Sequence, residues 1–329
     1  MTGTLWITGA GGFTGRHLAA FVASLTDRPL VIGLDIATRV DAELDGYACV
    51  NVCDGSAVEA LARRLPPRWV IHLAGATSAP TAADLWETNA GGITGLLLGL
   101  AAAGCRRVRL LGIGSAAEYA AASGVRLTER SPLGPASDYG KAKLAQTMIT
   151  VQLSRTLGFD ACVARVFNLL GPGLPSCFVG GRLAEQFARP QGDVWVAHTA
   201  SGRDFVDVRD AADAYWRLVR CGRPGEIYNV CTGRAVMIAE LVDRLAALSG
   251  ASHCLRTDAH GEVDSSVVFG SCTKLRRHTG WTPLIALDRT LEDMLRSCSM
   301  ESRITRGRRS SGAPLARSRA AAAWRQAWR

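Results

Sequence analysis

The stretch TLWITGAGGFTG at residues 4–15 decides the fold that this sequence of 329 residues predicts. Its apolar first half is typical of a short strand, and apolar residues recur at helical spacing after it, from Leu18 to Leu25. Gly9, Gly12 and Gly15 allow a tight turn, bring the backbone close to a pyrophosphate and let the helix pack on the strand. Unpaired N–H groups at the helix start suit phosphates. The stretch therefore predicts a dinucleotide-binding loop.

An acidic residue stands where such a loop needs one. The next apolar run, residues 30–34, ends in Asp35, which lies 20 residues beyond Gly15. An acid about 20 residues on accepts hydrogen bonds from the ribose hydroxyls of the adenosine. Because a carboxylate repels a 2′-phosphate, we expect NAD as the cofactor. Arg39 is close enough in sequence to leave NADP possible.

Strand and helix patterns alternate as far as residue 167. Further strands are expected at 47–50, 69–73, 108–113 and 161–167, and helices at 56–65, at 84–103 and from residue 139 onward. This alternation predicts an α/β fold with a doubly wound parallel sheet, a Rossmann fold. Ligands of such sheets bind beyond the carboxyl ends of the strands, where Gly75 and Ser115 are expected to lie.

The pattern loosens after Asn168, and Gly171-Pro172-Gly173 indicates a crossing into a second unit. We expect a dinucleotide-binding domain at 1–170, with 203–230 returning to it. A smaller, α-rich C-terminal substrate domain is expected from 171–202 and 231–300. Its helices are predicted at 180–188, 237–249, 271–278 and 287–298, and a basic tail without fixed structure at 301–329.

Charge is concentrated at one end of the chain. Of the net charge of +9, eight units come from arginines in residues 302–329, where no acid occurs, so the body carries +1. We therefore expect no nucleic-acid partner for the body, and at most polyanion contact through the tail.

The ten cysteines and six histidines show no metal-ligand spacing, and we expect no metal site. The longest apolar run, Ile93 to Ala103, is shorter than the ~18 residues of a membrane span. Because strand pattern begins by residue 4, we expect no signal peptide. We expect a cytoplasmic protein with free thiols.

Tyr139 and Lys143 lie four residues apart in a predicted helix and share one face of it. A nearby positive charge lowers the pKa of a phenol from its usual ~10, toward the range in which a general acid or base works best. The spacing alone is common by chance. It gains weight from Ser115 at the end of strand 108–113, a candidate hydrogen-bond partner for a substrate oxygen.

Ordered motifs carry a family resemblance. They are TGAGGFTG at 8–15, Asp35, HLAGATS at 72–78, Asn89, Ser115, YGKAK at 139–143, RVFNLLGPG at 165–173, RDFVDV at 203–208 and YNVCTGRAV at 228–236. In this order they resemble the extended short-chain dehydrogenase/reductases, the NAD-dependent epimerase/dehydratase family of nucleotide-sugar enzymes. Within it, SCFVGGRLAEQFA at 176–188 and GEIYNVCTGRAV at 225–236 most resemble GDP-4-keto-6-deoxy-D-mannose reductases, which form GDP-D-rhamnose.

The resemblance implies a role for each matching residue. Tyr139 would donate a proton, Lys143 would assist it and bind the ribose, and Ser115 would bind the sugar oxygen. Cofactor contacts would come from Gly9, Gly12, Phe13, Thr14, Gly15, Asp35, Asn51, Val52, Leu73, Ala74, Gly75, Asn89, Tyr139 and Lys143. Substrate contacts would come from Thr77, Ser115, Asn168 and Arg203, the last two at the diphosphate. We also expect a homodimer.

Three departures from the family pattern bear on function. Ala117 stands where dehydratases carry a glutamate, although Glu118 is adjacent, so dehydration is not expected. Asn51 replaces the usual aspartate of the adenine-contact motif and can still accept a bond. Gly261 replaces a second diphosphate arginine, for which His260 or Arg256 could substitute.

The sequence thus predicts an NAD(P)-dependent reductase of the 4-keto group of a nucleotide-linked 6-deoxy sugar. The alternative is a nucleotide-sugar 4-epimerase that keeps NAD tightly bound and consumes none of it. A more remote alternative is a non-catalytic dinucleotide sensor. The complete set of Ser115, Tyr139 and Lys143 argues against a sensor, because a sensor needs no proton donor.

Overall fold

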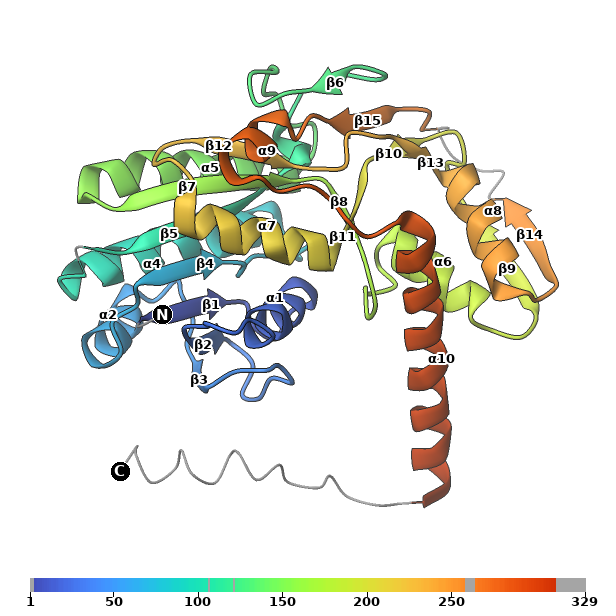
Figure 1. The fold of residues 1–329 in the computed structure, drawn as a ribbon, viewed down its shortest axis with the longest axis horizontal. Helices are drawn as coiled ribbons and strands as arrows, with labels where there is room; N and C mark the ends of the chain where they lie inside the picture. The colour runs from blue at the N-terminus through green and yellow to red at the C-terminus, as the bar shows by residue number, and fades with distance from the viewer. Residues whose placement is uncertain (1–2, 106, 121, 258–263, 312–329) are drawn as a thin grey trace.

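A parallel sheet of seven strands forms the centre of the molecule in a computed structural model that describes residues 3–105, 107–120, 122–257 and 264–311 (Figure 1). The strand order is β12-β7-β5-β4-β1-β2-β3, and every neighbouring pair is parallel. The strands are β1 (Thr4–Thr8), β2 (Leu30–Asp35), β3 (Gly46–Cys49), β4 (Trp69–His72), β5 (Arg109–Ser115), β7 (Asp160–Val166) and β12 (Ile227–Val230). The predicted doubly wound α/β fold is confirmed.

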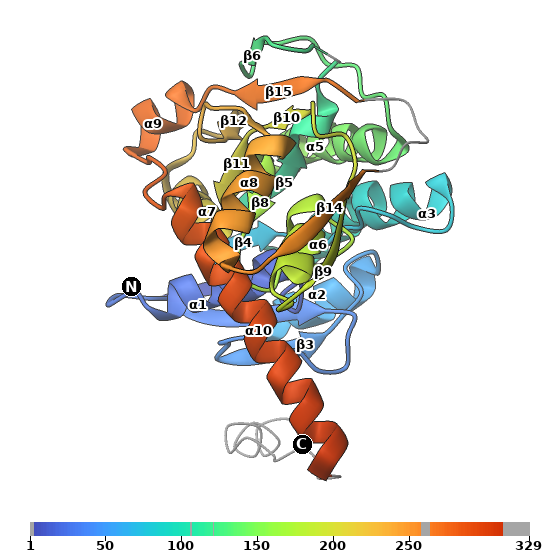
Figure 2. The same ribbon diagram turned by 90° about the vertical axis from the view of Figure 1, so that its right-hand side faces the viewer.

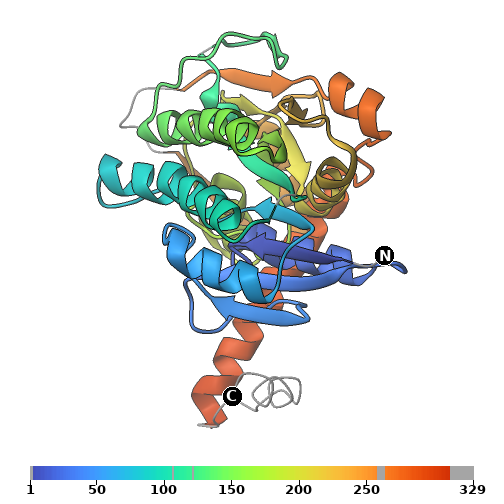
Figure 3. The same cartoon turned by 90° about the vertical axis from the view of Figure 1, so that its left-hand side faces the viewer.

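Helices cover both faces of this sheet. On one face α1 (Phe13–Ala23) packs beside α7 (Val208–Cys221); on the other, α2 (Gly55–Arg64), α4 (Gly92–Ala102) and α5 (Asp138–Leu157) lie in a row (Figure 3). Side chains of β1 alternate between the two cores: Leu5 and Ile7 pack on the first face and Trp6 on the second. Burial on both faces explains why the strands read as continuous apolar runs.

The helix expected at 84–103 is broken into three parts. It consists of α3 (Ala82–Trp86), a π-helical turn (Glu87–Gly91) and α4. Asn89 lies in the π-helical turn, and its side-chain Nδ2 donates to the carbonyl oxygen of Leu85 at 2.9 Å, in competition with the backbone. One extra residue in the turn redirects the Asn89 side chain, and such turns are frequent at functional sites.

A second region follows the main sheet. Its apolar core lies between α6 (Val179–Phe187), α8 (Ile238–Ser249) and α10 (Leu287–Ser311), beside the paired strands β9 (Gly192–Val196) and β14 (His253–Thr257). Sequence analysis did not predict the short strands that lie in this region or pair with it, because two to four residues carry too little periodicity. They are β6 (Arg126–Leu127), β8 (Asn168–Leu170), β10 (Gly202–Arg203), β11 (Phe205–Asp207), β13 (Val236–Met237) and β15 (Val267–Gly270). A further helix, α9 (Thr273–Thr279), precedes α10.

The last helix is longer than predicted. We expected it to end at residue 298 and a tail without structure to begin at 301, but α10 is helical through Ser311 and projects past the sheet (Figure 2). The arginines that suggested a tail are also good helix formers. Residues 312–329 lie outside the described residues.

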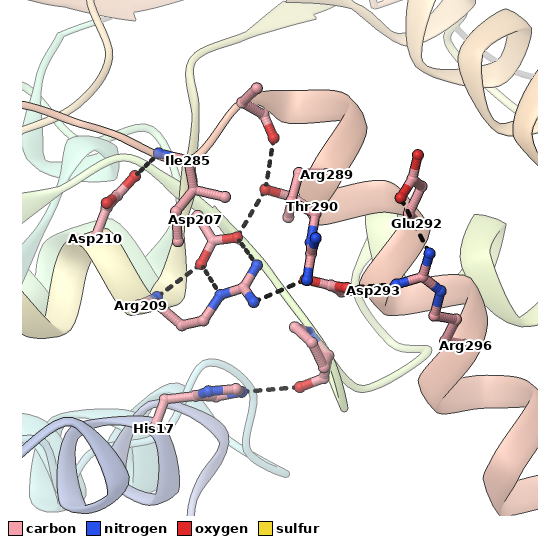
Figure 4. Close-up of polar contacts among 12 residues, drawn as sticks. His17, Asp207, Arg209, Asp210, Ile285, Arg289, Thr290, Glu292, Asp293 and Arg296 are labelled. Atoms are coloured by element: carbon pink, nitrogen blue, oxygen red, sulfur yellow. Dashed lines mark hydrogen bonds and ion pairs between the residues drawn. The ribbon is translucent and has the colours of Figure 1, made fainter. Parts of the chain in front are cut away.

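A polar network joins α10 to the start of α7 (Figure 4). The buried carboxylate of Asp207 caps α7 and accepts hydrogen bonds from the guanidinium of Arg209 and, at 2.7 Å, from the hydroxyl of Thr290. Arg209 also donates to Asp293 of α10 at 2.8 Å. These contacts hold the second region against the end of the main sheet.

Candidate active site

Two adjoining cavities lie at the carboxyl ends of the strands, where a doubly wound sheet is expected to bind its ligands. Their volumes are about 800 Å³ and about 490 Å³, and Gly9, Gly12, Leu73 and Gly75 line both. All residues predicted to bind cofactor or substrate line one or both of them. The structure therefore brings together residues that span the chain from Gly9 to Arg203.

The glycine loop is built to let backbones approach each other. Gly9 adopts φ +68°, and a Cβ atom there would lie 2.8 Å from the backbone nitrogen of Ala74. A Cβ atom on Gly15 would lie 2.3 Å from the carbonyl oxygen of Gly9. Any other residue at either position would push the loop away from β4 or from α1. Phe13 and Thr14, at the start of α1, line the larger cavity.

The smaller cavity lies beside Asp35. The Asp35 carboxylate accepts hydrogen bonds from the backbone N–H groups of Gly11, at 2.9 Å, and Ala37, at 3.2 Å. Asn51, Val52 and Ala74 complete the predicted lining. Arg16 and Arg39 line it as well. Arg16 was not predicted, because its place one turn into α1 gives no sequence signal.

Tyr139 and Lys143 face the larger cavity from the first turns of α5. The helix begins after Ser137, whose hydroxyl accepts a hydrogen bond from the N–H of Gly140 at 3.1 Å. A Cβ atom on Gly140 would lie 2.4 Å from the carbonyl oxygen of Ala117, so the glycine brings α5 against the turn that follows Ser115. Ser115, at the end of β5, therefore shares the cavity with Tyr139.

Burial shifts the pKa values of both Lys143 and Tyr139. It lowers the pKa of Lys143 to about 8, although Glu118 acts in the opposite direction. The Lys143 ammonium donates to Gln146 at 2.6 Å. We expected Lys143 to lower the pKa of the Tyr139 phenol, but that pKa is raised, since burial outweighs the opposing contact with Ser115 and Glu118 adds to it. The phenol accordingly keeps its proton at neutral pH.

Asn89 lines the larger cavity and has a buried side-chain oxygen. Its Nδ2 donates to the carbonyl oxygen of Ala76 at 3.0 Å, while its buried Oδ1 has no hydrogen-bond partner among the described residues. A Cβ atom on Gly75 would lie 2.6 Å from that oxygen. His72 is fully buried and lines neither cavity; burial lowers its pKa to about 3.

Thr77, Asn168 and Arg203, which we predicted to bind substrate, line the larger cavity, and so do the apolar side chains of Phe178 and Phe205. Arg203 is already paired: its Nη2 donates to Asp264 at 2.6 Å. Sequence analysis missed Asp264, which precedes β15 and is distant in sequence from Arg203.

Two substitutes were suggested for the second diphosphate arginine. His260, like Gly261 itself, lies outside the described residues. Arg256 lies on β14, paired with Asp193 at 3.3 Å, and does not line the cavity.

Within the described ranges no group of three or more His, Cys, Asp or Glu side chains could hold a metal ion. A search of the same ranges finds no helix of the length and apolarity that crossing a membrane requires.

Comparison with known proteins identifies a family and several relatives of this chain. Residues 5–231 match the NAD dependent epimerase/dehydratase family. The GDP-6-deoxy-D-mannose reductase of Pseudomonas aeruginosa is 32% identical over 316 residues, covering 92% of this chain and 99% of that protein. UDP-glucose 4-epimerase 2 of Oryza sativa subsp. japonica is 27% identical over 330 residues, covering 88% of this chain and 80% of that protein.

Solved structures agree over most of the chain. RMD from Pseudomonas aeruginosa complexed with NADPH has a TM-score of 0.80 and 30% identity, covering 91% of this chain and 99% of that one. UDP-glucose 4-epimerase from Thermotoga maritima with UDP-glucose also has a TM-score of 0.80, at 22% identity, covering 92% of this chain and 99% of that one. The latter shows likeness of fold alone.

Proposed function

The chain belongs to the NAD dependent epimerase/dehydratase family, and on that premise we propose that it is an NAD(P)-dependent reductase of the 4-keto group of a nucleotide-linked 6-deoxy sugar, of the GDP-4-keto-6-deoxy-mannose type. The observation that carries the proposal is the cavity in which Ser115, Tyr139 and Lys143 meet the glycine loop. The 32% identity to a GDP-6-deoxy-D-mannose reductase supports this substrate class.

The residues present fit a dinucleotide. Gly9 and Gly15 line the larger cavity without a side chain, and the buried Asn89 oxygen has no hydrogen-bond partner among the described residues. The glycine loop would hold the pyrophosphate, and Asp35 the adenosine ribose. When bound, the nicotinamide supplies the hydride. We propose NAD as the preferred cofactor because of Asp35, with NADP accepted through Arg16 and Arg39.

Each catalytic candidate has a distinct task. The neutral Tyr139 phenol donates its proton to the sugar oxygen as negative charge develops there. Ser115 donates a hydrogen bond to the same oxygen, and Lys143 places a positive charge beside the phenol. Ala117, in place of a dehydratase glutamate, lines the cavity with a methyl group, so no acid at that position assists loss of water.

Incubation with GDP-4-keto-6-deoxy-mannose and NADH or NADPH tests this function. We expect oxidation of one reduced cofactor per reduced sugar. An epimerase, which the rice relative favours as the second candidate, would interconvert a nucleotide sugar without net use of cofactor. Binding of cofactor without turnover of any nucleotide sugar would leave the sensor alternative.

Cofactor choice is tested by titrating the protein with each dinucleotide. We expect tighter binding of NADH than of NADPH, and a reversal of that order when Asp35 is replaced by serine, because the carboxylate no longer repels a 2′-phosphate. Tenfold tighter binding of NADPH by the unaltered protein would contradict the role of Asp35.

We also propose a homodimer. Trp86, Leu98 and Met148 expose 44%, 47% and 59% of their surface on α3, α4 and α5, which lie side by side. Light scattering should give twice the monomer mass, and Leu98→Lys with Met148→Lys should give the monomer. Leu284→Lys, at an apolar residue exposed elsewhere, is the control.

Two further proposals concern the division of the chain into domains and its location in the cell. The chain divides into a dinucleotide unit, 1–170 with 203–230, and a substrate unit, 171–202 with 231–300. The free thiols of the described cysteines suit the cytoplasm.

We further propose that the basic tail contacts polyanions. A variant without residues 312–329, which hold four arginines and no acid, should bind heparin more weakly and keep its turnover. Loss of turnover would show that the tail belongs to the site.

A further inference from the structure

The carboxylate of Glu118 is fully buried and fully hydrogen-bonded just behind the cavity. One oxygen, Oε1, accepts from the backbone N–H of Ser115 at 2.6 Å and from the hydroxyl of Thr147 at 3.0 Å. The other, Oε2, accepts from Nε and Nη2 of Arg165 at 2.9 and 2.7 Å. Glu118 does not line the cavity, so it cannot replace the missing glutamate of a dehydratase.

The partners of Glu118 come from the three elements that carry the site. Ser115 ends β5, Thr147 lies one helical turn after Lys143 on α5, and Arg165 lies on β7 opposite Gly114. A Cβ atom on Gly114 would lie 2.4 Å from Oε1, so the glycine makes room for the carboxylate. A single side chain thus fixes the distance between Ser115 and the helix of Tyr139 and Lys143.

Arg165 is itself held in place. It is fully buried, and its guanidinium lies 4.6 Å from the centre of the Tyr119 ring. The Tyr119 hydroxyl donates to Asn229 at 2.7 Å on β12. A buried ion pair gives little net stability by itself, because both charges lose their hydration. We therefore look for a role of the Glu118–Arg165 pair other than stability.

We propose that Glu118, oriented by Arg165, is a positioning residue: it fixes the backbone of Ser115 and places a negative charge near Lys143. The effect on turnover rests on the proposed reductase function, whereas the effect on Lys143 does not.

Three titratable groups act on or beside Lys143. Glu118 raises its pKa against the effect of burial, Tyr139 lies one turn before it, and His72 is neutral above pH 3. Removing the charge of Glu118 should therefore lower the pKa of Lys143 below about 8, so that the ammonium begins to lose its proton near neutral pH.

The chain suits a direct test, because its lysines are just three, Lys141, Lys143 and Lys274. Carbon-13 labelling of their Cε atoms gives three NMR titrations, and loss of a signal in Lys143→Ala assigns the site. In the unaltered protein we expect Lys143 to titrate near 8. Glu118→Gln should shift that titration to lower pH, whereas Thr147→Val, which removes one hydrogen bond and keeps the charge, should leave it in place.

Glu118→Gln leaves the charge of Arg165 buried without a partner, and this can prevent folding. The double variant Glu118→Gln/Arg165→Met removes both charges and should show the same shift. With a confirmed keto-sugar substrate, both variants should lose about 10²-fold in turnover, the effect of an ångström-scale misplacement, and bind NADH unchanged. Glu240→Gln, which weakens an ion pair with Arg244 on α8 away from both cavities, is the control.

A folded variant with the Lys143 titration and the turnover of the unaltered protein would overturn the proposal. Absence of turnover in the unaltered protein would instead count against the reductase function, and the NMR titrations would still decide the electrostatic role of Glu118.

Discussion

In the mechanism that we propose, Tyr139 donates a proton although its phenol is not unusually acidic. Burial raises its pKa, which keeps the proton in place until the substrate oxygen gains negative charge. In the same proposal, the positive charge of Lys143 would stabilise the phenolate that remains. The raised pKa suits a reductase, in which the tyrosine acts as an acid.

Replacing this phenol tests that role. Tyr139→Phe should reduce turnover by about 10² to 10⁴-fold, the usual contribution of a positioned general acid. Folding and NADH binding should persist, because we propose that the glycine loop and Asp35 supply the main contacts to the cofactor. Tyr228→Phe, which removes a hydroxyl that bonds His278 away from the cavities, is the control. Full turnover in Tyr139→Phe would rule out the mechanism.

Burial of His72 leads to a prediction about how stability depends on pH. Its pKa is about 3 in the folded protein and about 6.5 in an unfolded chain, so between these values the unfolded state binds more protons. The free energy of unfolding should therefore fall as pH drops from 6.5 to 3. Over that range, the free energy of unfolding should change with pH more steeply in the unaltered protein than in His72→Gln, by up to about 1.4 kcal/mol per pH unit. Urea titrations at several pH values measure both, and equal slopes would contradict burial of a neutral His72.

Residues of the site were predictable where a motif marks them. The glycine loop, Asp35, Asn89 and the Tyr139–Lys143 pair each occupy a fixed place relative to a strand or helix, and all line the cavities. The contact of Asp264 with Arg203 and those of Glu118 with Thr147 and Arg165 were not predictable, because they join residues 61, 29 and 47 positions apart. The first of these contacts depends on how the second region folds, and those of Glu118 depend on how α5 and β7 pack beside β5.

At the scale of elements, the contact between α2 and α4 depends on glycine. A Cβ atom on Gly99 would lie 2.5 Å from the carbonyl oxygen of Gly55 and 2.7 Å from the Cβ of Val58. The helices approach closely here, and α4 continues from the π-helical turn that holds Asn89. Close packing of α4 therefore helps fix the position of a cavity residue.

Gly99→Ala should lower the free energy of unfolding by about 1–3 kcal/mol, because the methyl group must displace backbone. Gly91→Ala is the matched control, since its Cβ atom would meet its nearest neighbour at an ordinary 3.8 Å. Denaturant titration measures both. An equal effect at the two positions would show that the helices can move apart at no cost.

At the scale of the whole molecule, alternating strand and helix patterns were sufficient to predict six of the seven strands of the central sheet, because most of their residues are apolar and buried. The four-residue strand β12 was not predicted. The second region was predicted less well. Its short strands are defined by pairing with distant segments, as in β8 with β11 and β10 with β15, and not by their own sequence. The cavity lies where these two regions meet, so its shape depends on the less predictable one.

The network around Asp207 should therefore control how firmly the two regions hold together. Thr290 on α10 is buried, and its hydroxyl donates to the Asp207 carboxylate. Thr290→Val keeps the shape of the side chain and leaves a buried charged group with one donor fewer, which should cost about 1–3 kcal/mol in the free energy of unfolding. The exposed Thr156, whose hydroxyl bonds the backbone of its own helix, is the control as Thr156→Val. Because Asp207 links α10 to α7 of the main sheet, we expect Thr290→Val to lower the single denaturant midpoint of the whole chain. A loss no larger than that of Thr156→Val would show that the apolar core of the second region, and not this network, holds α10 in place.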